Sequence, residues 1–243
     1  MFRRPDQLAA RFEGILQSYL QGVNDNWLLI APESNPGMLE MFRDKNARPL
    51  RALVPWAGEF PGKYLLSAVQ VHRIYRDSRL RAFLERFVDR LLSLQQDDGY
   101  LGPWPSEFQM KNYAPNCMHT IESIEEDYVV WDTWGHYMII QGLLEWHEET
   151  GDTRALESAR RIGDRVCDEF LGAAHPRRLA DVGWTGMTFG ILHGMTLLYR
   201  ATGVQRFLDM ALQFVDELSV RDAEGKPLAC DLLEQALQDV EFY

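Results

Sequence analysis

The sequence predicts an all-α protein built from repeated helix hairpins. Apolar residues recur at steps of three and four along every long segment, which is the period of an amphipathic helix, and the alternation typical of a strand is nearly absent. A related segment also occurs three times, each time after an apolar helix. Helix hairpins of this kind stack into an open solenoid or curl into a closed α/α toroid, so we expect one of these architectures.

The periodicity predicts about seven helices with short connections. In the first, Leu8, Phe12, Ile15, Leu16 and Tyr19 share one face, which we expect to be buried. The later segments show the same kind of apolar stripe. The expected helices span residues 7–20, 63–76, 79–95, 131–149, 153–171, 187–201 and 205–219.

The threefold repeat consists of a two-residue turn followed by an amphipathic helix. The turns are Arg76-Asp77, Gly151-Asp152 and Gly203-Val204. In each copy the second turn residue stands twelve positions before an aspartate. These aspartates are Asp89, Asp164 and Asp216. The first interval between copies is the longer one because it contains an additional loop, residues 96–130, and long loops in compact domains are often functional.

Composition and charge limit the classes of function. The 243 residues suit a single domain over 1–243, and a hydrophobic content of 46% provides a sizeable core. The net charge of −11 argues against nucleic acid as a partner, because phosphate binding needs clustered Lys and Arg. No apolar run of ~18 residues occurs, which predicts no membrane segment and, with the charged first twenty residues, a cytoplasmic location. An aromatic content of 12% is common where flat sugar faces are bound.

Neither the cysteines nor the common catalytic motifs identify a reactive site. Cys117, Cys167 and Cys230 are widely spaced and odd in number, which predicts neither a disulfide framework nor a zinc knuckle, and favours a reducing compartment. The sequence contains no nucleophile elbow, phosphate-binding loop, HExxH pair or dinucleotide turn. Candidate residues must therefore come from local constellations.

The stretch WAGEFPGKYLLSA begins a helix with an unusual density of special residues. Pro61 and Gly62 set a rigid entry into the helix. Glu59 and Lys63 are four residues apart, so their side chains can point together. We expect this pair to face the space that the hairpins enclose and to contact a ligand there.

Two residues in the 96–130 loop are candidates for sugar contacts. Asp98 and Tyr100 lie beside Gly99, where an acid can accept hydrogen bonds from sugar hydroxyls while the ring stacks below. The structural alternative is a helix C-cap in which Gly99 is left-handed and the acid faces water. A later acidic run is interpreted as a solvated face or a helix start. Its members are Glu122, Glu125, Glu126 and Asp127.

The segment WDTWGH opens the next long helix and adds further candidates. Asp132 and His136 are four residues apart, so an acid and an imidazole share a face and can hold a polar ligand. Trp131 and Trp134 flank them, and core tryptophans behind a dipole-stabilising Asp132 are the structural alternative. His193 lies inside an apolar helix, where a satisfied buried histidine and a substrate contact are both open interpretations.

Taken together, these motifs resemble one family. In chain order they read WAGEFPGKYL, QxxDGYLG, WDTWGHYMIIQGLLEWHEETGDTRALESARRIGD and ILHGMTLLYRATGVQRFLDMA. The combination resembles the glycosidase superfamily typified by β-L-arabinofuranosidases, glycoside hydrolase family 127, over about residues 50–220. Two positions differ from the pattern of that family, since His136 stands where Lys or Arg is usual and His193 replaces a glutamate.

The resemblance implies an (α/α)6 barrel whose funnel binds a terminal sugar, with this chain as the N-terminal part of a larger catalytic domain and the barrel incomplete. It also implies a cysteine nucleophile near zinc and a glutamate acid/base in the later half of the barrel. We therefore expect the catalytic residues beyond residue 243, no cofactor in this chain, and zinc in the full-length enzyme. The expected substrate contacts are Glu59, Lys63, Asp98, Tyr100, Trp131, Asp132, His136 and His193.

The predicted function is hydrolysis of the O-glycosidic bond of a terminal sugar, as in β-L-arabinofuranosidases. We also expect self-association through the barrel edge that the remaining helices would cover. Two alternatives stay open. One is another α/α-barrel sugar enzyme, a 2-epimerase or an unsaturated-uronyl hydrolase, with chemistry carried by His136 and His193 or an aspartate. The other is a non-catalytic carbohydrate-binding protein built from helix pairs.

Overall fold

The structure is a computed structural model, and the all-α prediction is confirmed. β-Structure within the described ranges is limited to isolated bridges, as between Leu53 and Cys117. No helix in these ranges combines the length and the apolar composition needed to cross a membrane. The described residues are 12–117, 128–172, 177–182, 185–221 and 223–225.

Seven α-helices of nine or more residues make up most of the described chain. They are α1 (Ile15–Val23), α4 (Phe60–Tyr75), α5 (Ser78–Leu92), α6 (Asp132–Thr150), α7 (Thr153–Phe170), α9 (Gly190–Thr202) and α10 (Gln205–Leu218). The shorter elements are a π-helical turn (Asn24–Leu28), α2 (Ala31–Ser34), α3 (Gly37–Arg43), α8 (Thr185–Thr188) and 3-10 turns at Ala57–Glu59, Ser106–Phe108 and Leu179–Asp181.

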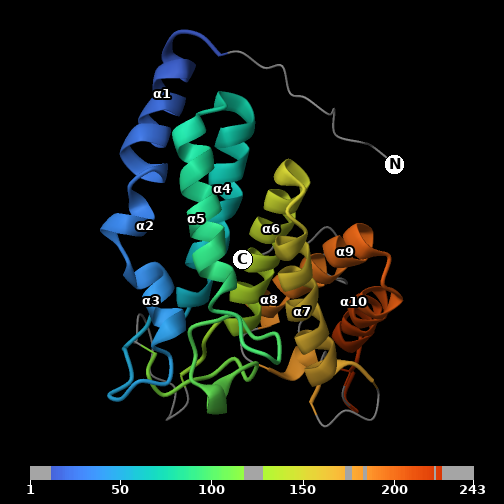
Figure 1. Cartoon of the computed structure of the whole chain (residues 1–243). Helices are drawn as coiled ribbons and strands as arrows, with labels where there is room; N and C mark the ends of the chain where they lie inside the picture. The colour runs from blue at the N-terminus through green and yellow to red at the C-terminus, as the bar shows by residue number, and fades with distance from the viewer. Residues whose placement is uncertain (1–11, 118–127, 173–176, 183–184, 222, 226–243) are drawn as a thin grey trace.

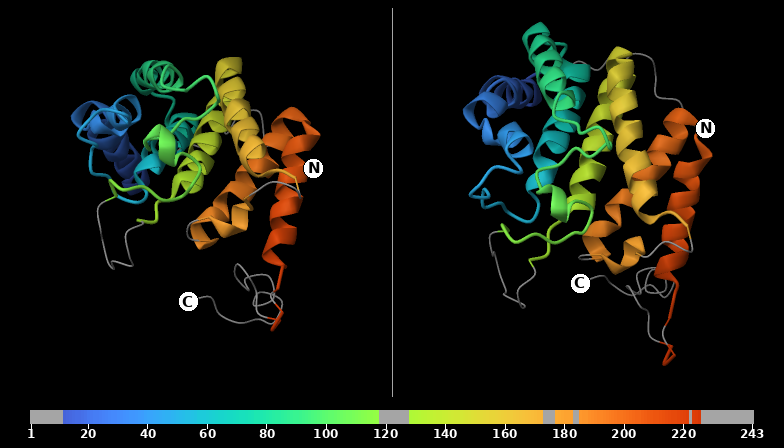
Figure 2. Two further views of the ribbon diagram at one scale, coloured as in Figure 1. Left: turned by 90° about the horizontal axis from the view of Figure 1, so that it is seen from below. Right: turned by 60° about the horizontal axis from the view of Figure 1, so that its bottom comes forward.

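The helices after α3 form a row of three hairpins, α4–α5, α6–α7 and α9–α10 (Figure 1). In this row α6 packs against both α4 and α9, and α7 packs against both α5 and α10. The first helices of the hairpins therefore form an inner row and the second helices an outer row, seen from below in Figure 2. Along the chain an inner helix is followed each time by an antiparallel outer helix. The inner helices α4, α6 and α9 therefore run in the same direction, and their N-termini all lie at the end with the long loops (Figure 1).

Six of the seven predicted helices are confirmed, with ends displaced by three residues at most. The first one differs, because α1 begins at Ile15 rather than at residue 7, and Leu8 lies outside the described residues. The predicted burial of its apolar face is wrong, since Ile15, Leu16 and Tyr19 are 70%, 55% and 66% exposed. The physical reason is that α1 stands at the edge of the row, where it contacts α4 but none of its residues is buried.

Close packing of α4 against α6 explains the glycine in the stretch that begins α4. A Cβ on Gly62 would lie 2.2 Å from the backbone carbon of Met138, and one on Gly142 would lie 2.9 Å from the carbonyl oxygen of Gly62. Any larger side chain at these positions would force the two helices apart. The short distance between α4 and α6 therefore depends on glycine at both positions.

The three turns of the repeat have one backbone conformation. A residue with positive φ follows the first helix of each hairpin, and the next residue is extended and precedes the second helix. This left-handed C-cap satisfies the last carbonyl groups of the first helix. The positive-φ residues are Arg76 (54°), Gly151 (74°) and Gly203 (70°).

The second turn residue caps the outer helix in two of the three copies. The carboxylates of Asp77 and Asp152 accept the backbone N–H groups of Arg79 and Arg154, at 2.7 and 3.0 Å. Val204 has no acceptor to offer at the same position. The sequence repeat thus corresponds to a repeated helix cap that is incomplete in the third hairpin.

Ion pairs connect α4 and α6 near the turns. Arg73 on α4 is 12% exposed and pairs with Glu145 and Glu149 on α6. Arg76 pairs with the same Glu149. Mostly buried pairs of this kind hold neighbouring helices in one register, because removing one partner leaves an uncompensated charge.

Candidate functional site

The N-terminal ends of the inner helices bring together an acid, a lysine and an indole. Glu59, directly before α4, is buried. Its carboxylate accepts the Nε1–H of Trp134 on α6 and pairs with the Lys63 ammonium at 2.7 Å. Lys63 Nζ also lies 5.8 Å from the centroid of a Trp134 ring. The expectation that Glu59 and Lys63 point together is therefore confirmed.

A second set of contacts joins α6 to α9. The Tyr137 hydroxyl lies 3.1 Å from His193 Nδ1, and Tyr137 packs edge-on against Trp134 with ring centroids 5.3 Å apart. A Cβ on Gly190 would lie 2.6 Å from the Trp134 ring, so glycine is required where α9 begins. We call the five residues on or directly before α4, α6 and α9 the inner-helix cluster. Its members are Glu59, Lys63, Trp134, Tyr137 and His193.

The cluster presents polar groups on an aromatic base. His193 is exposed, and the Lys63 side chain is 47% exposed, whereas that of Glu59 is 8% exposed. Burial raises the pKa of Tyr137, so its hydroxyl remains protonated at neutral pH and can donate a hydrogen bond. An ammonium, a hydroxyl and an imidazole around an indole are the mixture of donors, acceptors and flat apolar surface that suits a sugar.

Three predicted substrate contacts have a structural role instead. Tyr100, Asp132 and His136 are 0%, 1% and 0% exposed, so they have no surface on which to touch a ligand. The Tyr100 hydroxyl donates to Asp132 Oδ1 at 3.1 Å, and the Met110 N–H donates to Asp132 Oδ2 at 2.8 Å. His136 accepts the Leu101 N–H at its Nε2. These bonds attach the long loop to the first turn of α6.

Trp131 and Asp98 lie outside the inner-helix cluster. Trp131 is half-buried against Trp56, with ring centroids 5.3 Å apart, immediately before α6. Asp98 accepts the Tyr100 N–H at 3.0 Å and faces Arg165 of the outer helix α7 at 3.4 Å. The helix C-cap that was the structural alternative is also wrong, because α5 already ends at Leu92, and Asp98 instead stabilises a turn of the loop in which Gly99 has a positive φ. The acidic run from Glu122 to Asp127 lies outside the described residues.

Sequence reasoning missed two residues that the structure places at the site. The sequence pattern left Trp134 open between flanking a ligand and packing in the core, and it did not single out Tyr137. A signal was available, because Tyr137 follows Trp134 by three positions and therefore shares its helix face. In the structure this face of α6 contacts His193 on α9. The pairing itself depends on how α9 lies against α6, which the sequence pattern does not specify.

The described residues do not fit the zinc ion that the family resemblance implies. No group of three or more His, Cys, Asp or Glu side chains in the described ranges is arranged to hold a metal. Burial raises the pKa of Cys117 to about 11 and of Cys167 to about 12, so both thiols are protonated at neutral pH and are poor ligands and nucleophiles. Cys230 lies outside the described residues.

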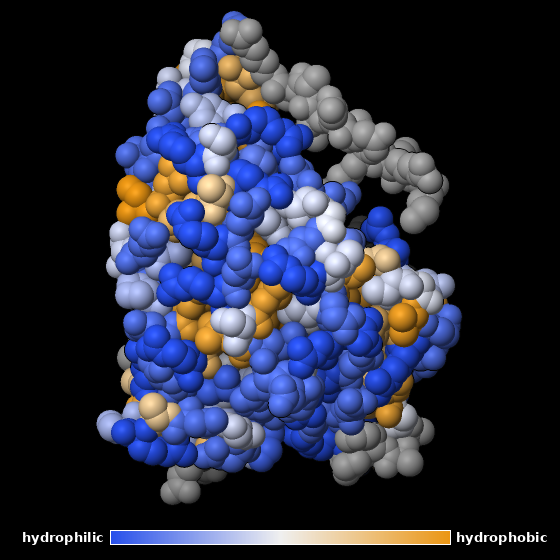
Figure 3. Space-filling view, viewed as in Figure 1, coloured by the Kyte–Doolittle hydropathy of each residue, from blue (hydrophilic) through white to orange (hydrophobic). Residues whose placement is uncertain are grey.

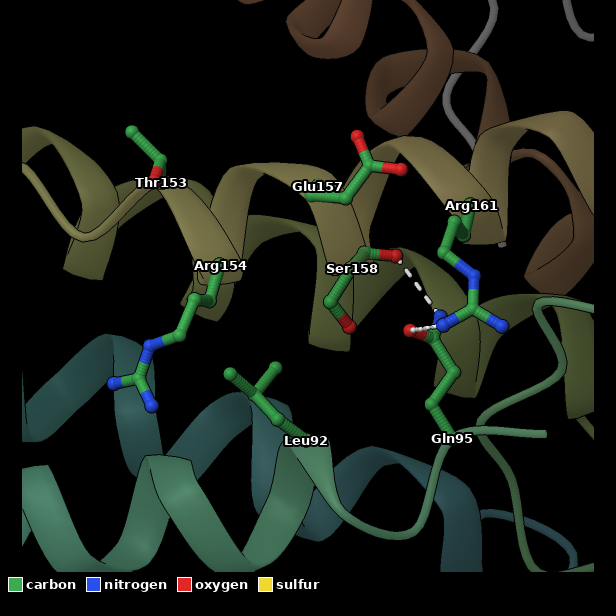
Figure 4. A pocket seen from close by; sticks show the side chains of 7 residues that line it. All are labelled: Leu92, Gln95, Thr153, Arg154, Glu157, Ser158 and Arg161. Carbon is green, nitrogen blue, oxygen red and sulfur yellow. Dashed lines mark hydrogen bonds between the residues drawn. The ribbon is translucent and has the colours of Figure 1, made fainter. Parts of the chain in front are cut away.

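A groove of about 390 Å³ lies elsewhere, between α5 and α7 (Figure 4). Its polar groups already bind one another, because Gln95 donates to the Ser158 carbonyl at 3.0 Å and accepts from Arg161 at 3.3 Å. Leu92 lines the same groove on the α5 side. We interpret it as the seam between two hairpins and not as a ligand site.

The three hairpins, with one inner and one outer row of helices, define the class of protein as one built on α/α hairpins. The inner-helix cluster lies at the loop end of these hairpins. The family model described as "Beta-L-arabinofuranosidase, GH127 catalytic domain" matches residues 15–236, which is most of the chain. The chain therefore belongs to glycoside hydrolase family 127. A curated relative, the non-reducing end β-L-arabinofuranosidase of Bifidobacterium longum subsp. longum, is 27% identical over 165 residues.

Solved structures agree on the fold. A GH127 β-L-arabinofuranosidase from Geobacillus stearothermophilus T6 superposes with a TM-score of 0.65 at 15% identity, over 95% of this chain and 35% of the other. A second GH127 β-arabinofuranosidase gives a TM-score of 0.66 at 19% identity, over 89% of this chain and 35% of the other. The match to the curated relative covers 63% of this chain and 22% of that protein. The chain thus spans about a third of the solved relatives and less of the curated one.

Proposed function

We propose that this chain forms the N-terminal part of the catalytic barrel of a glycoside hydrolase that acts on a terminal β-L-arabinofuranosyl group. The observation that carries the proposal is the inner-helix cluster, in which three hairpins contribute to one sugar-compatible surface at the loop end of an α/α barrel. The family membership and the names of the relatives support the choice of sugar. The cleavage chemistry is assigned to the part of the barrel that this chain does not contain.

Each member of the cluster has a defined task in this proposal. The Trp134 ring supplies the flat surface against a sugar face, and Glu59 fixes the ring through its Nε1–H. Lys63 donates hydrogen bonds to the ring oxygen or hydroxyl oxygens of the sugar. The Tyr137–His193 pair binds one sugar hydroxyl by donating one hydrogen bond to it and accepting one from it. Trp131, half-buried beside Trp56, extends the aromatic border.

The proposal is tested by binding of methyl β-L-arabinofuranoside to the 243-residue chain, followed by NMR or calorimetry. We expect Trp134→Ala and Glu59→Gln each to weaken binding at least tenfold, because the first removes the stacking surface and the second its anchor. Trp27→Ala is the matched control, since Trp27 is 59% exposed in the π-helical turn before α2, outside the inner-helix cluster, and should leave binding unchanged. Equal affinity in all three variants would contradict the proposal.

The structure weakens the rival enzyme hypothesis at one point. For a 2-epimerase or uronyl hydrolase, the chemistry was expected from His136 and His193 or from an aspartate. Since His136 is 0% exposed and bonded to the Leu101 N–H, only His193 of this pair can meet a substrate. In the complete enzyme, we expect His193→Asn to raise KM for an arabinofuranoside more than it lowers kcat, which a purely catalytic base would not do.

Self-association is a further part of this proposal, and α1 carries it. A row of apolar side chains spaced by three or four residues runs along α1 and the π-helical turn, and α1 contains no charged residue that would repel a second copy. We propose that this face pairs with a second copy when nothing else covers it. Light scattering should show a dimer that Tyr19→Glu dissociates and Gln17→Glu does not. The row is Ile15, Tyr19, Val23, Trp27 and Ile30.

The proposed location is the cytoplasm. The two described cysteines, Cys117 and Cys167, are buried and do not form a disulfide, as expected in a reducing compartment. Zinc binding is proposed only for the complete barrel, on the basis of the family resemblance. Metal analysis of the 243-residue chain beside the complete enzyme would test that assignment directly.

A further inference from the structure

One buried amide side chain of the long loop binds to two other segments at the loop end. The outer face that α5 and α7 form is largely hydrophilic (Figure 3). At the loop end, in contrast, several polar side chains are buried between segments. Asn112 is one of them, with 1% of its surface exposed, and it is neither a predicted contact nor a member of the inner-helix cluster. Its hydrogen bonds reach the first turn of α6 and the segment before α9.

Asn112 caps the N-terminal end of α6 from outside that helix. The first N–H groups of a helix have no partner within the helix, and the N-cap residue Trp131 provides no side-chain acceptor for them. Asn112 Oδ1 accepts the backbone N–H of Thr133 at 3.0 Å, and Asn112 Nδ2 lies 3.1 Å from Thr133 Oγ1. Because only the amide oxygen can accept an N–H, this bond also fixes the direction in which the amide nitrogen points.

The amide nitrogen of Asn112 points toward the segment before α9. It lies 3.3 Å from the carbonyl oxygen of Val182 and 3.4 Å from Thr188 Oγ1, and the Thr188 hydroxyl donates to the same carbonyl at 3.1 Å. The two N–H groups of the amide are therefore shared between these acceptors and Thr133 Oγ1. Thr188 ends α8, two residues before α9 begins at Gly190. We call this set of bonds the Asn112 link, because it connects α6 to the start of α9.

The backbone around Asn112 is also bound to α6. Asn112 has a φ of 54°, in the left-handed region that asparagine tolerates better than most residues. Its carbonyl accepts the N–H of Val130, two residues before α6, at 2.9 Å. Two residues earlier in the loop, the N–H of Met110 donates to Asp132 Oδ2 at 2.8 Å. The loop is therefore fixed against α6, so Asn112 provides a fixed position from which α9 is held.

The packing of α9 against its neighbours is mainly apolar and does not by itself fix where His193 lies along α6. Contacts between apolar groups are non-directional, so they permit small shifts of one helix along another. Hydrogen bonds have a narrow range of distance and angle, so the bonds at Thr188 restrict such a shift. The distance between His193 and Tyr137 depends on this restriction. The buried residues of α9 are Ile191, Gly194, Met195 and Leu198.

We propose that Asn112 is a positioning residue for the candidate site, which sets the Tyr137–His193 contact by holding the start of α9 against the first turn of α6. It acts through Thr188 and α9 and not by contact with the sugar. The inference rests on the proposed function, because there the Tyr137–His193 pair binds one hydroxyl of the arabinofuranosyl group. The link itself is a property of the chain without a ligand and can be measured separately.

The proposal is tested on the 243-residue chain by NMR of the His193 imidazole. Asn112→Asp keeps the acceptor for the N–H of Thr133 and removes the donors to the segment before α9. We expect the His193 resonances to shift and the NOE between the His193 and Tyr137 rings to weaken. The indole N–H of Trp146, at the turn end of α6, should keep its position, which excludes a general loss of structure. Affinity for methyl β-L-arabinofuranoside should fall about three- to tenfold, as for the loss of one hydrogen bond.

Variants at the other end of the link test it without a buried charge. Thr188→Val removes the hydroxyl, so we expect the same change at His193. Thr188→Ser keeps the hydroxyl and should leave the His193 resonances at their parent positions. Gln109→Ala is the matched control, because Gln109 is also a buried amide of the long loop, 6% exposed, but donates to the Trp104 carbonyl within that loop. It should leave His193 unchanged.

Two results would overturn the proposal. One is a set of His193 resonances that stays at its parent positions in Asn112→Asp and in Thr188→Val. The other is an equal shift in Thr188→Ser or Gln109→Ala, because the effect would then not pass through the Thr188 hydroxyl. If Asn112→Asp does not fold, the Thr188 variants decide alone. The NMR measurement contains no sugar, so an altered His193 contact with unchanged affinity would contradict the sugar-binding role of the pair and leave the Asn112 link intact.

Discussion

The two ends of the hairpins are built in different ways. At the turn end, two residues connect each pair of helices, and charged groups such as Arg73 and Glu149 tie α4 to α6. At the other end the connections are long, and aromatic and polar side chains are buried between loop and helix. The comparison teaches that short capped turns are enough to set the row of hairpins, which leaves the opposite end free to carry a binding surface.

The largest effect is expected where the loop end depends on close helix packing. Gly62→Ala should cost about 3 kcal/mol of unfolding free energy or prevent folding, because the new Cβ would lie 2.2 Å from the backbone of Met138. Urea unfolding followed by circular dichroism measures this. Gly22→Ala is the control, because a Cβ there meets only the Asn26 side chain at 3.9 Å and should be neutral or slightly stabilising.

The next effect compares the stability contribution of a buried acid with that of a half-exposed one. Asp132→Ala leaves the Tyr100 hydroxyl and the Met110 N–H without their acceptor inside the protein, which should cost about 2–4 kcal/mol. Asp98→Ala, at a side chain that is 49% exposed, should cost less than about 1 kcal/mol. If the two variants were equally stable, the loop would not depend on the buried network.

A smaller effect concerns pH at the turn end. The hydrogen bond from Arg79 lowers the pKa of Asp77 to about 2 in the folded chain, from an ordinary 3.8. Its contribution is therefore present above about pH 4 and is lost as the pH falls toward 2. With solvent screening this amounts to about 0.5–1 kcal/mol. Between pH 6 and pH 3, Asp77→Asn should lose less stability than the parent chain, and an identical loss would exclude this origin.

The smallest effect completes the turn end. Val204→Asp should supply the cap that Asp77 and Asp152 provide in the other two turns, by accepting the backbone N–H of Arg206. We expect a gain of about 0.5–1 kcal/mol, measured as a higher thermal midpoint. A lower midpoint would show that the third turn is not equivalent to the other two.

The sequence predicts the fold far better than the site. Periodicity and turn residues locate the six helices of the three hairpins because each helix buries one stripe, and the repeat of the turns follows from local caps. The roles of Tyr100 and His136 are not predictable in this way, because the same side chains suit a buried network and a sugar site. Tyr137 becomes visible only when α9 lies beside α6. Burial, which decides between these roles, is a tertiary property.

The common direction of the inner helices has an electrostatic consequence. In an antiparallel bundle neighbouring helix dipoles cancel, but the peptide dipoles of α4, α6 and α9 all point their positive ends toward the loops. Glu59 and Asp132 stand at two of these positive ends, which favours a carboxylate there despite the acidic charge of the whole chain. The antiparallel outer helices turn their negative ends to the same side, so the positive potential is confined to the inner surface, within about one turn of the ends of α4, α6 and α9.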